Sequence, residues 1–247
     1  MTKTTDAKHA PRTGQNLRAW GLLLVTSLFV IAPIFATSFR GYAQEDFPNS
    51  IVDLPGQPAG WAFSIWSVIY VGLIVSAIYG VFKAANDDAW DRIRVPMILS
   101  VGLGVTWLEV AQSAPVWATV QIFAMAGTAI WAVLRLPIER RALLDEPIGL
   151  YAGWVTAAAG VSLCVVLTGY GVMKPDAAAI FCLLLICVVA VVVISFSHTP
   201  RGYPLAVSWA FFGVLMANID NGMMIPSLAG LAISAIALVA LTGRNAR

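Results

Sequence analysis

Residues 95–134 read VPMILSVGLGVTWLEVAQSAPVWATVQIFAMAGTAIWAVL and hold a single charged side chain, that of Glu109. As one helix at 1.5 Å per residue, this stretch would be about 60 Å long, about twice the hydrocarbon thickness of a bilayer. It must therefore cross a membrane twice. The two crossings are expected to meet at Ser113-Ala114-Pro115, because proline can begin a helix but cannot continue one. Glu109 then lies about one turn before that bend.

The composition is that of an integral membrane protein. Apolar residues make up 59% of the chain and charged residues 11%, and the mean hydropathy is +0.81. These values are far from those of a water-soluble domain. Runs long enough to cross the hydrocarbon core occur eight times, at 18–38, 62–82, 95–113, 116–135, 148–168, 177–197, 203–219 and 223–241. We therefore predict an all-α fold, a polytopic bundle of eight transmembrane helices in one domain at residues 17–242.

The basic residues set the expected orientation. With eight crossings, every Lys and Arg except Arg40 and Lys174 falls on one side of the membrane, and cytoplasmic segments carry such an excess. Both termini are therefore predicted to be cytoplasmic, as a disordered tail at 1–16 and a short tail at 243–247. These side chains act as membrane anchors, so the expected partner is the lipid bilayer and no nucleic acid is expected. The first run is too long for a secretory signal and is expected to be retained.

Enzyme, metal and haem chemistry find no support in the sequence. Cys164, Cys182 and Cys187 lie inside predicted spans without C-x-x-C spacing, so neither a disulfide framework nor a zinc site is predicted. His9 and His198 lie outside the spans, which leaves no imidazole within the membrane to ligate haem. The chain has no H-E-x-x-H, G-x-S-x-G or P-loop motif. We predict no catalytic residue, no bound metal and no cofactor, in a protein that is not an enzyme.

Glu109 needs an explanation, because an acidic side chain such as Asp costs about 2.5 to 3.5 kcal/mol at the middle of a bilayer. Such a residue is expected to face protein or water. Helical spacing gathers on one face of this span the small or polar residues Gly102, Thr106, Glu109, Gln112 and Ser113. Two roles are open for Glu109: part of a pocket or ion-coupling site, or a structural hydrogen bond to a neighbouring helix.

The start of the second span carries the densest motif, PAGWAFSIWSVIY at residues 58–70. Spacing of three and four residues places Phe63, Trp66 and Tyr70 on one side of a helix. Trp61 lies at the expected outer interface, where indole rings are common. Such an aromatic stripe serves either as packing or as a ligand site. The proline and glycine before it, and its outer position, favour the mouth of a pocket.

At this motif the sequence resembles the TspO/MBR family of tryptophan-rich sensory proteins, whose second helix begins with P-x-G-W-x-F followed by W-x-x-x-Y. Three further features are similar to the family: Trp107 in the third span, LYAGWV at 150–155 and YPLAVSWA at 203–210. Together they cover most of residues 55–215. The resemblance is closest to the longer members, and it implies a five-helix core at about 17–170 followed by extra helices at about 175–242.

The sequence departs from the family pattern at two places. Compared with the short five-helix form, one residue is missing between Phe63 and Trp66, which rotates the later ring by about 100°. Ser162 stands where the fifth helix of similar proteins commonly has asparagine. The resemblance implies binding of tetrapyrroles or other flat hydrophobic molecules such as sterols, with a regulatory or transport-related role. We predict a multi-pass protein of the bacterial cytoplasmic (inner) membrane.

Two functions are consistent with the sequence. The first is a receptor or sensor whose pocket opens to the outer leaflet and binds a flat hydrophobic ligand. The expected ligand-binding residues are Trp61, Phe63, Trp66, Tyr70 and Trp107, with Glu109, Gln112 and Asn218 at the polar edge of the ligand. The alternative is a small secondary transporter in which Glu109 exchanges a proton. Small-residue stretches at 157–160 and 229–232 suit either close contact between helices of the chain or a homodimer interface.

Overall fold

The computed structural model describes residues 13–35, 47–49, 51, 53–139, 141–196 and 198–245. Within them the chain forms no strand and eight α-helices: α1 (Thr13–Phe35), α2 (Ile65–Phe82), α3 (Asp88–Ser113), α4 (Pro115–Leu134), α5 (Ala142–Gly169), α6 (Pro175–Phe196), α7 (Gly202–Ala217) and α8 (Met224–Asn245). A short 3₁₀ helix, η2 (Gly60–Ser64), leads into α2. The predicted all-α bundle is confirmed. The predictions for His9, Arg40 and residues 36–38 concern positions outside the described residues.

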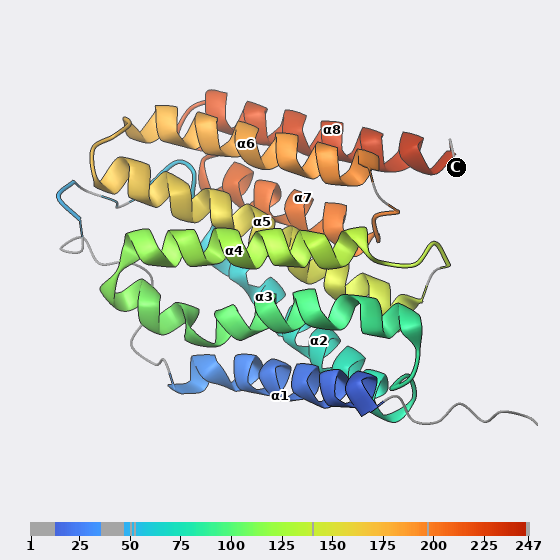
Figure 1. The fold of residues 1–247 in the computed structure, drawn as a ribbon. Coiled ribbons are helices and arrows are strands. Elements are labelled where there is room, and N and C mark those ends of the chain that lie inside the picture. The colour runs from blue at the N-terminus through green and yellow to red at the C-terminus, as the bar shows by residue number, and fades with distance from the viewer. Residues whose placement is uncertain are drawn as a thin grey trace, which may run out of the picture.

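Consecutive helices run in opposite directions, so the start of α1 and the end of α8 lie at the same end of the bundle (Figure 1). Seven of the helices in the described residues are long and apolar enough to cross a membrane. The eighth, α7, has 16 residues and is about 24 Å long; it packs against α5 and α8. The arrangement agrees with both termini on one side of the membrane. That this side is cytoplasmic stays a prediction.

Several helices extend further into polar sequence than hydropathy predicted, including α1, α3, α5 and α8. α3 begins at Asp88 rather than near residue 95, because Asp87 caps it by accepting a hydrogen bond from the Ala89 amide at 2.8 Å. Acidic residues in the first turn of α3 also suit the positive end of a helix dipole. α1 begins at Thr13, so residues 13–16, predicted to belong to the disordered tail, are helical.

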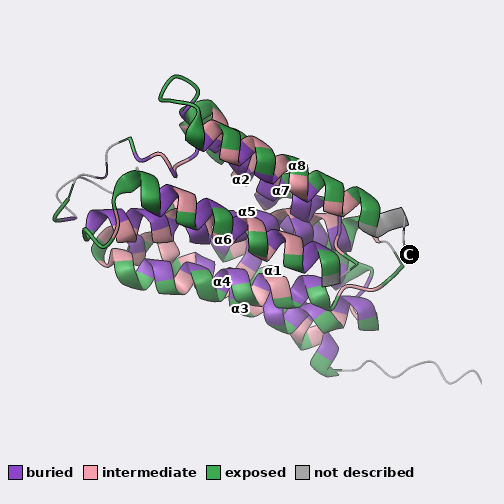
Figure 2. Ribbon diagram, turned by 90° about the horizontal axis from the view of Figure 1, so that it is seen from above, coloured by how far each residue is buried: buried purple, intermediate pink, exposed green. Residues whose placement is uncertain are grey.

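α5 is the most buried of the spanning helices, with 67% of its span inside the protein, and it packs against α2, α4, α6 and α7. Buried residues of the helices face the inside of the bundle and exposed residues face outwards (Figure 2). Glycine permits the closest contacts: a Cβ atom at Gly153 would lie 2.4 Å from the carbonyl oxygen of Tyr203 in α7. The small residues at 157–160, predicted to suit close helix contact or a homodimer interface, are largely buried against helices of the same chain, as the first alternative expects. A homodimer itself stays a prediction.

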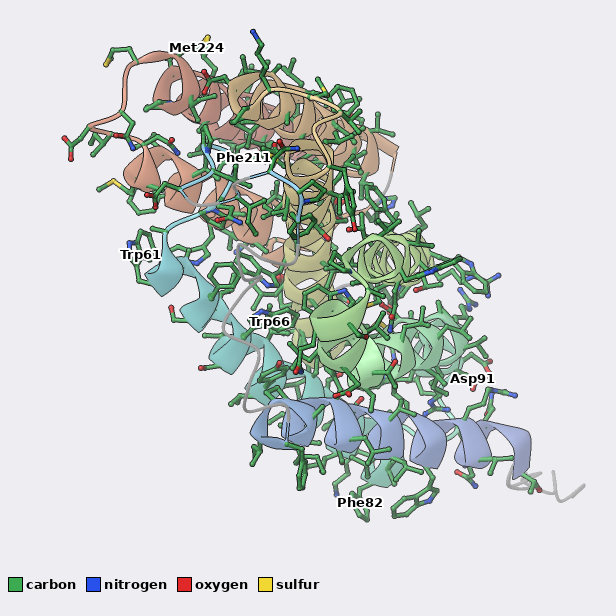
Figure 3. All side chains as sticks on the ribbon, turned by 90° about the vertical axis from the view of Figure 1, so that its left-hand side faces the viewer. Trp61, Trp66, Phe82, Asp91, Phe211 and Met224 are labelled. Atoms are coloured by element: carbon green, nitrogen blue, oxygen red, sulfur yellow. The ribbon has the colours of Figure 1, made fainter. Side chains whose placement is uncertain are left out.

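A buried arginine fixes the end of the bundle where α2 meets α3. Arg94 is only 1% exposed, and its guanidinium donates hydrogen bonds at 2.8–3.2 Å to five acceptors: the Asp91 carboxylate and the backbone carbonyls of Gln15, Gly80, Ala84 and Ala85. We call these residues the Arg94 anchor. Asp91, labelled in Figure 3, also accepts a 2.5 Å hydrogen bond from Arg18 in α1. The anchor therefore joins α1, α2, α3 and the chain between α2 and α3.

The opposite end is covered by the described residues of the segment that precedes η2. Its apolar side chains Phe47, Ile51 and Leu54 are buried. The Ala59 amide donates to the carbonyl of Gly213 at 3.0 Å, and the Asn218 side chain donates to the carbonyl of Pro55 at 3.0 Å. These bonds fix the start of η2, and with it the aromatic motif, against the end of α7.

Candidate ligand-binding site

Six aromatic rings from α1, η2, α2 and α5 meet inside the bundle. We call them the aromatic cluster: Phe29, Phe63, Trp66, Tyr70, Tyr151 and Trp154. The rings on η2 and α2 are three and four residues apart, and the two rings on α5 are three apart, so each set lies on one side of its helix. Because α2 packs against α5, the two sets meet. The predicted common side of Phe63, Trp66 and Tyr70 is confirmed.

Trp66, labelled in Figure 3, contacts three other rings of the cluster, those of Phe29, Tyr70 and Trp154. Its ring stacks on that of Tyr70, with ring centres 5.3 Å apart and planes at 22°. Trp154 meets Trp66 at 6.2 Å and Phe63 at 5.7 Å, both edge to face. Such pairs add about 0.5–1.5 kcal/mol each beyond the area they bury. Since Phe63 is 46% exposed and Trp66 is partly buried, the cluster runs from the protein surface into its core.

Phe29 of α1 contacts three of the other rings in the cluster, those of Trp66, Tyr70 and Tyr151. Its ring centre lies 5.4 Å from that of Tyr70, 5.8 Å from Trp66 and 6.0 Å from Tyr151, with the planes at 75–83° in each pair. Three aromatic rings thus meet one phenyl ring edge to face. Phe29 is buried and also presses on α3, where a Cβ atom at Gly104 would come within 2.5 Å of the phenyl ring.

The polar groups of the cluster differ in how they are paired. The Tyr151 hydroxyl lies 2.9 Å from Ser100 Oγ, which donates to the carbonyl of Met125 at 2.7 Å. The indole N–H of Trp154, in a side chain that is 2% exposed, has no hydrogen-bond partner among the described residues. A buried donor of this kind costs about 1–3 kcal/mol until an acceptor reaches it. The cluster therefore combines apolar ring faces with one unused donor.

Trp61 belongs to a second group of rings at the outer edge of α7. It is 46% exposed, and its ring centre lies 5.2 Å from that of Trp209 and 5.7 Å from that of Phe212. Figure 3 places Trp61 at the edge of the molecule and Trp66 further inside. The Trp209 indole donates to the carbonyl of Ala62 at 2.8 Å, which holds this group beside the aromatic cluster.

Three further residues predicted to bind the ligand, Trp107, Gln112 and Asn218, donate hydrogen bonds to backbone carbonyls instead. The Trp107 indole donates to the carbonyl of Ala118 in α4 at 2.9 Å. The Gln112 amide donates to the carbonyl of Leu108 in its own helix at 3.4 Å. Asn218 is buried and donates to the carbonyls of Pro55 and Val214. These side chains are thus engaged with the protein backbone.

Glu109 is exposed on α3, which does not favour the second of its two open roles, a structural hydrogen bond to a neighbouring helix. The physical reason is the direction of the helix face. The buried residues of the outer half of α3 include Gly104 and Ala111, and Glu109, two residues before Ala111, lies about 200° away around the helix. Of the residues that periodicity grouped with Glu109, Thr106 accepts a hydrogen bond from Gln121 of α4 at 3.0 Å, but Glu109 itself is exposed.

The match to a known protein family extends over all eight described helices. A family model described as TSPO-like protein matches residues 18–242, from α1 to α8. The chain belongs to the TSPO-like protein family. The match confirms the resemblance to the TspO/MBR family and includes the helices that follow the five-helix core. No curated protein and no solved structure matched the chain.

Sequence reasoning missed three members of the aromatic cluster in this TSPO-like protein. Tyr151 and Trp154 belong to the LYAGWV segment, and their spacing of three residues was a usable signal. Phe29 gave no such signal, because it is one apolar residue among many in α1. It becomes visible only through its place in the buried stripe Gln15, Ala19, Leu22, Thr26 and Phe29.

Two other features of the TSPO-like protein are poor candidates for a site. A cavity of about 10 Å³ lies between α5, α6 and α7 and is lined by apolar side chains such as Leu183 and Phe211. It has room for about one water molecule but no polar partner to hold one. Among the described residues, no three His, Cys, Asp or Glu side chains come together as metal ligands.

Proposed function

We propose that this TSPO-like protein is a membrane receptor or sensor that binds a flat hydrophobic molecule, such as a tetrapyrrole or a sterol, and is not an enzyme. The ligand contacts are Trp61, Phe63, Trp66 and Tyr70, to which we add Trp154. Aromatic faces with one well-placed polar group are typical of sites for small apolar ligands.

The unpaired indole N–H of Trp154 is the observation that carries this proposal. It is buried next to Trp66 and Phe63 and has no acceptor among the residues described. A ligand that brings a carbonyl, carboxylate or ring-nitrogen acceptor to this donor recovers the free energy that burial costs. The ligand we propose is therefore planar and apolar, with a hydrogen-bond acceptor at one edge.

The exposed rings at the start of α2 support access from the membrane. Trp61 and Phe63 are each 46% exposed, and they lie at the end of α2 that is remote from the Arg94 anchor. A planar ligand dissolved in the outer leaflet meets these rings first and then Trp66. The cytoplasmic (inner) membrane of a bacterium is the location we propose. The exposed position of Glu109 gives the alternative, proton-coupled transport, no support.

The test is a titration of the purified full-length protein in detergent with protoporphyrin IX, followed by its Soret band. We expect saturable binding to the wild type. Trp154→Phe keeps an aromatic ring but removes the donor, and we expect its affinity to be about tenfold lower, corresponding to about 1.4 kcal/mol.

Trp117→Phe is the matched control, because Trp117 is 69% exposed at the start of α4. It should bind like the wild type. Absence of saturable binding to the wild type contradicts the proposed ligand class, and equal affinities of the wild type and Trp154→Phe contradict the role of the indole N–H.

A further inference from the structure

Phe29 occupies a site of the size of one aromatic ring. Rings from two helices, those of Trp66 and Tyr70 on α2 and Tyr151 on α5, meet it edge to face. On the fourth side Gly104 of α3 leaves room that any larger residue would fill, since a Cβ atom there would come within 2.5 Å of the phenyl ring. With the phenyl group removed, these residues would outline a flat aromatic pocket.

The helix that carries Phe29 is fixed at its start by Gln15 and Arg18, but little of its surface is enclosed by the bundle. Only 22% of the α1 span is buried inside the protein, compared with 67% for α5. α1 lies at the edge of the bundle (Figure 1) and packs mainly against α2 and α3. Its buried residues are confined to one stripe that ends at Phe29. Low burial of this kind marks the segments that open most readily.

Pro33 weakens α1 at the turn that holds Phe29. In an α-helix the amide of residue 33 would donate to the carbonyl of residue 29. Proline has no amide hydrogen and its ring crowds that carbonyl, so helices bend or open at such a point. The helix is therefore weakest where its side chain enters the aromatic cluster.

We propose that Phe29 is a built-in occupant of the binding site, and that the turn from Phe29 to Pro33 swings outward to admit one aromatic ring of a ligand. This inference rests on the proposed function. It specifies the ligand further: a molecule that presents a single planar ring, such as one phenyl or pyrrole unit, to Trp66, Tyr70 and Tyr151. Because the occupied form competes with the ligand, the observed affinity is lower than that of the open site.

Two substitutions test the proposal in opposite directions, with protoporphyrin IX as the probe and the full-length protein in detergent. Phe29→Ala removes the occupant, and we expect about tenfold tighter binding. Pro33→Ala restores the helical hydrogen bond to the carbonyl of residue 29, and we expect about threefold weaker binding because opening becomes harder.

Two control variants separate a change in porphyrin affinity at Phe29 from a change caused by weaker packing of the helices in general. Leu22→Ala empties a buried position two turns earlier on the same stripe of α1, and Pro96→Ala removes a proline inside α3; both should bind like the wild type. If Phe29→Ala does not fold, Phe29→Leu fills the pocket incompletely and should tighten binding by a smaller factor. Toluene should raise the unfolding temperature of Phe29→Ala but not that of the wild type.

The outcomes distinguish this inference from the proposed function. Saturable binding to the wild type with no gain in Phe29→Ala or Phe29→Leu contradicts the role of Phe29 and leaves the receptor function standing. An equal gain in Leu22→Ala also contradicts it. If neither the wild type nor either Phe29 variant binds the porphyrin, the proposed function fails as well.

Discussion

The Arg94 anchor and the aromatic cluster lie towards opposite ends of α2, and they differ in how a buried hydrogen-bond donor is used. Arg94 is buried, but its guanidinium reaches a carboxylate and four carbonyls. Trp154 is buried as deeply, and its donor reaches no described residue. The comparison separates a region built for stability, in which buried donors are used, from one in which a donor is left for a ligand.

The largest expected effect comes from the anchor. Arg94→Met keeps much of the side-chain volume but leaves the carbonyls of Gly80, Ala84 and Ala85 without this donor and Asp91 without its buried partner. We expect the free energy of unfolding to fall by about 3–5 kcal/mol. Chemical unfolding in detergent micelles measures this change. A loss below about 1 kcal/mol would mean that the anchor is not a stabilising centre.

The next effect concerns the ligand. Trp66→Ala removes the ring that stacks on Tyr70 and meets Phe29 and Trp154. We expect the affinity for protoporphyrin IX to fall by about 2 kcal/mol, or about thirtyfold. Trp20→Ala, at a 54% exposed position on α1, serves as the control in the same titration. Equal affinities of Trp66→Ala and the wild type would show that Trp66 does not contact the ligand.

Two indoles that contact η2 or the start of α2 extend the comparison. The Trp209 N–H is bonded to the carbonyl of Ala62, whereas the Trp154 N–H is unpaired. Both substitutions replace an indole by a smaller ring and so lose packing, but Trp209→Phe also loses a hydrogen bond, and we expect that bond to add about 1 kcal/mol to its loss of unfolding free energy. Unfolding of the ligand-free protein checks both. A loss of stability in Trp154→Phe equal to that in Trp209→Phe would show that its donor is already satisfied.

The smallest expected effect is a pH dependence at the anchor end, where Arg141 pairs with Asp87. Partial burial acts to raise the pKa of Asp87, but its hydrogen bonds to Arg141 and to the Ala89 amide hold that pKa below its usual value. A carboxyl whose pKa is lower in the folded state stabilises the protein above its unfolded pKa of about 3.9, and this stability is lost as the pH falls through the folded pKa.

Arg141→Gln should therefore lower stability by less than about 1 kcal/mol at pH 7, and the difference from the wild type should shrink as the pH falls below about 4. Thermal unfolding of both proteins across this range measures it. A difference that stays constant with pH would show that the Asp87 carboxylate does not contribute through this pair.

The sequence predicted the helices well because each one is set by its own apolar run. Residues 95–134 had to fold back at Pro115, and α4 begins there. The common side of Phe63, Trp66 and Tyr70 also followed from spacing within one helix. These are local properties that need no knowledge of which helices become neighbours.

The surroundings of a side chain depend on which helices become neighbours, and these could not be predicted from the pattern within one helix. The sequence gives no way to distinguish Gly102 from Gly104. In the structure Gly104 packs against Phe29, whereas a Cβ atom at Gly102 would meet nothing within 4 Å. Spacing therefore could group the residues around Glu109 but could not tell that Glu109 itself is exposed. Phe29 was missed for the same reason, because its partners come from α2, α3 and α5.

The most direct test of the central claim is the indole NMR spectrum of the protein labelled with ¹⁵N-tryptophan, which has nine tryptophans. The Trp154 signal is assigned by its loss in Trp154→Phe. On saturation with protoporphyrin IX, we expect this indole proton to shift downfield as it forms a hydrogen bond, while the signal of Trp107, already bonded to Ala118, stays in place. A Trp154 signal that does not move when the ligand saturates the protein would contradict the account.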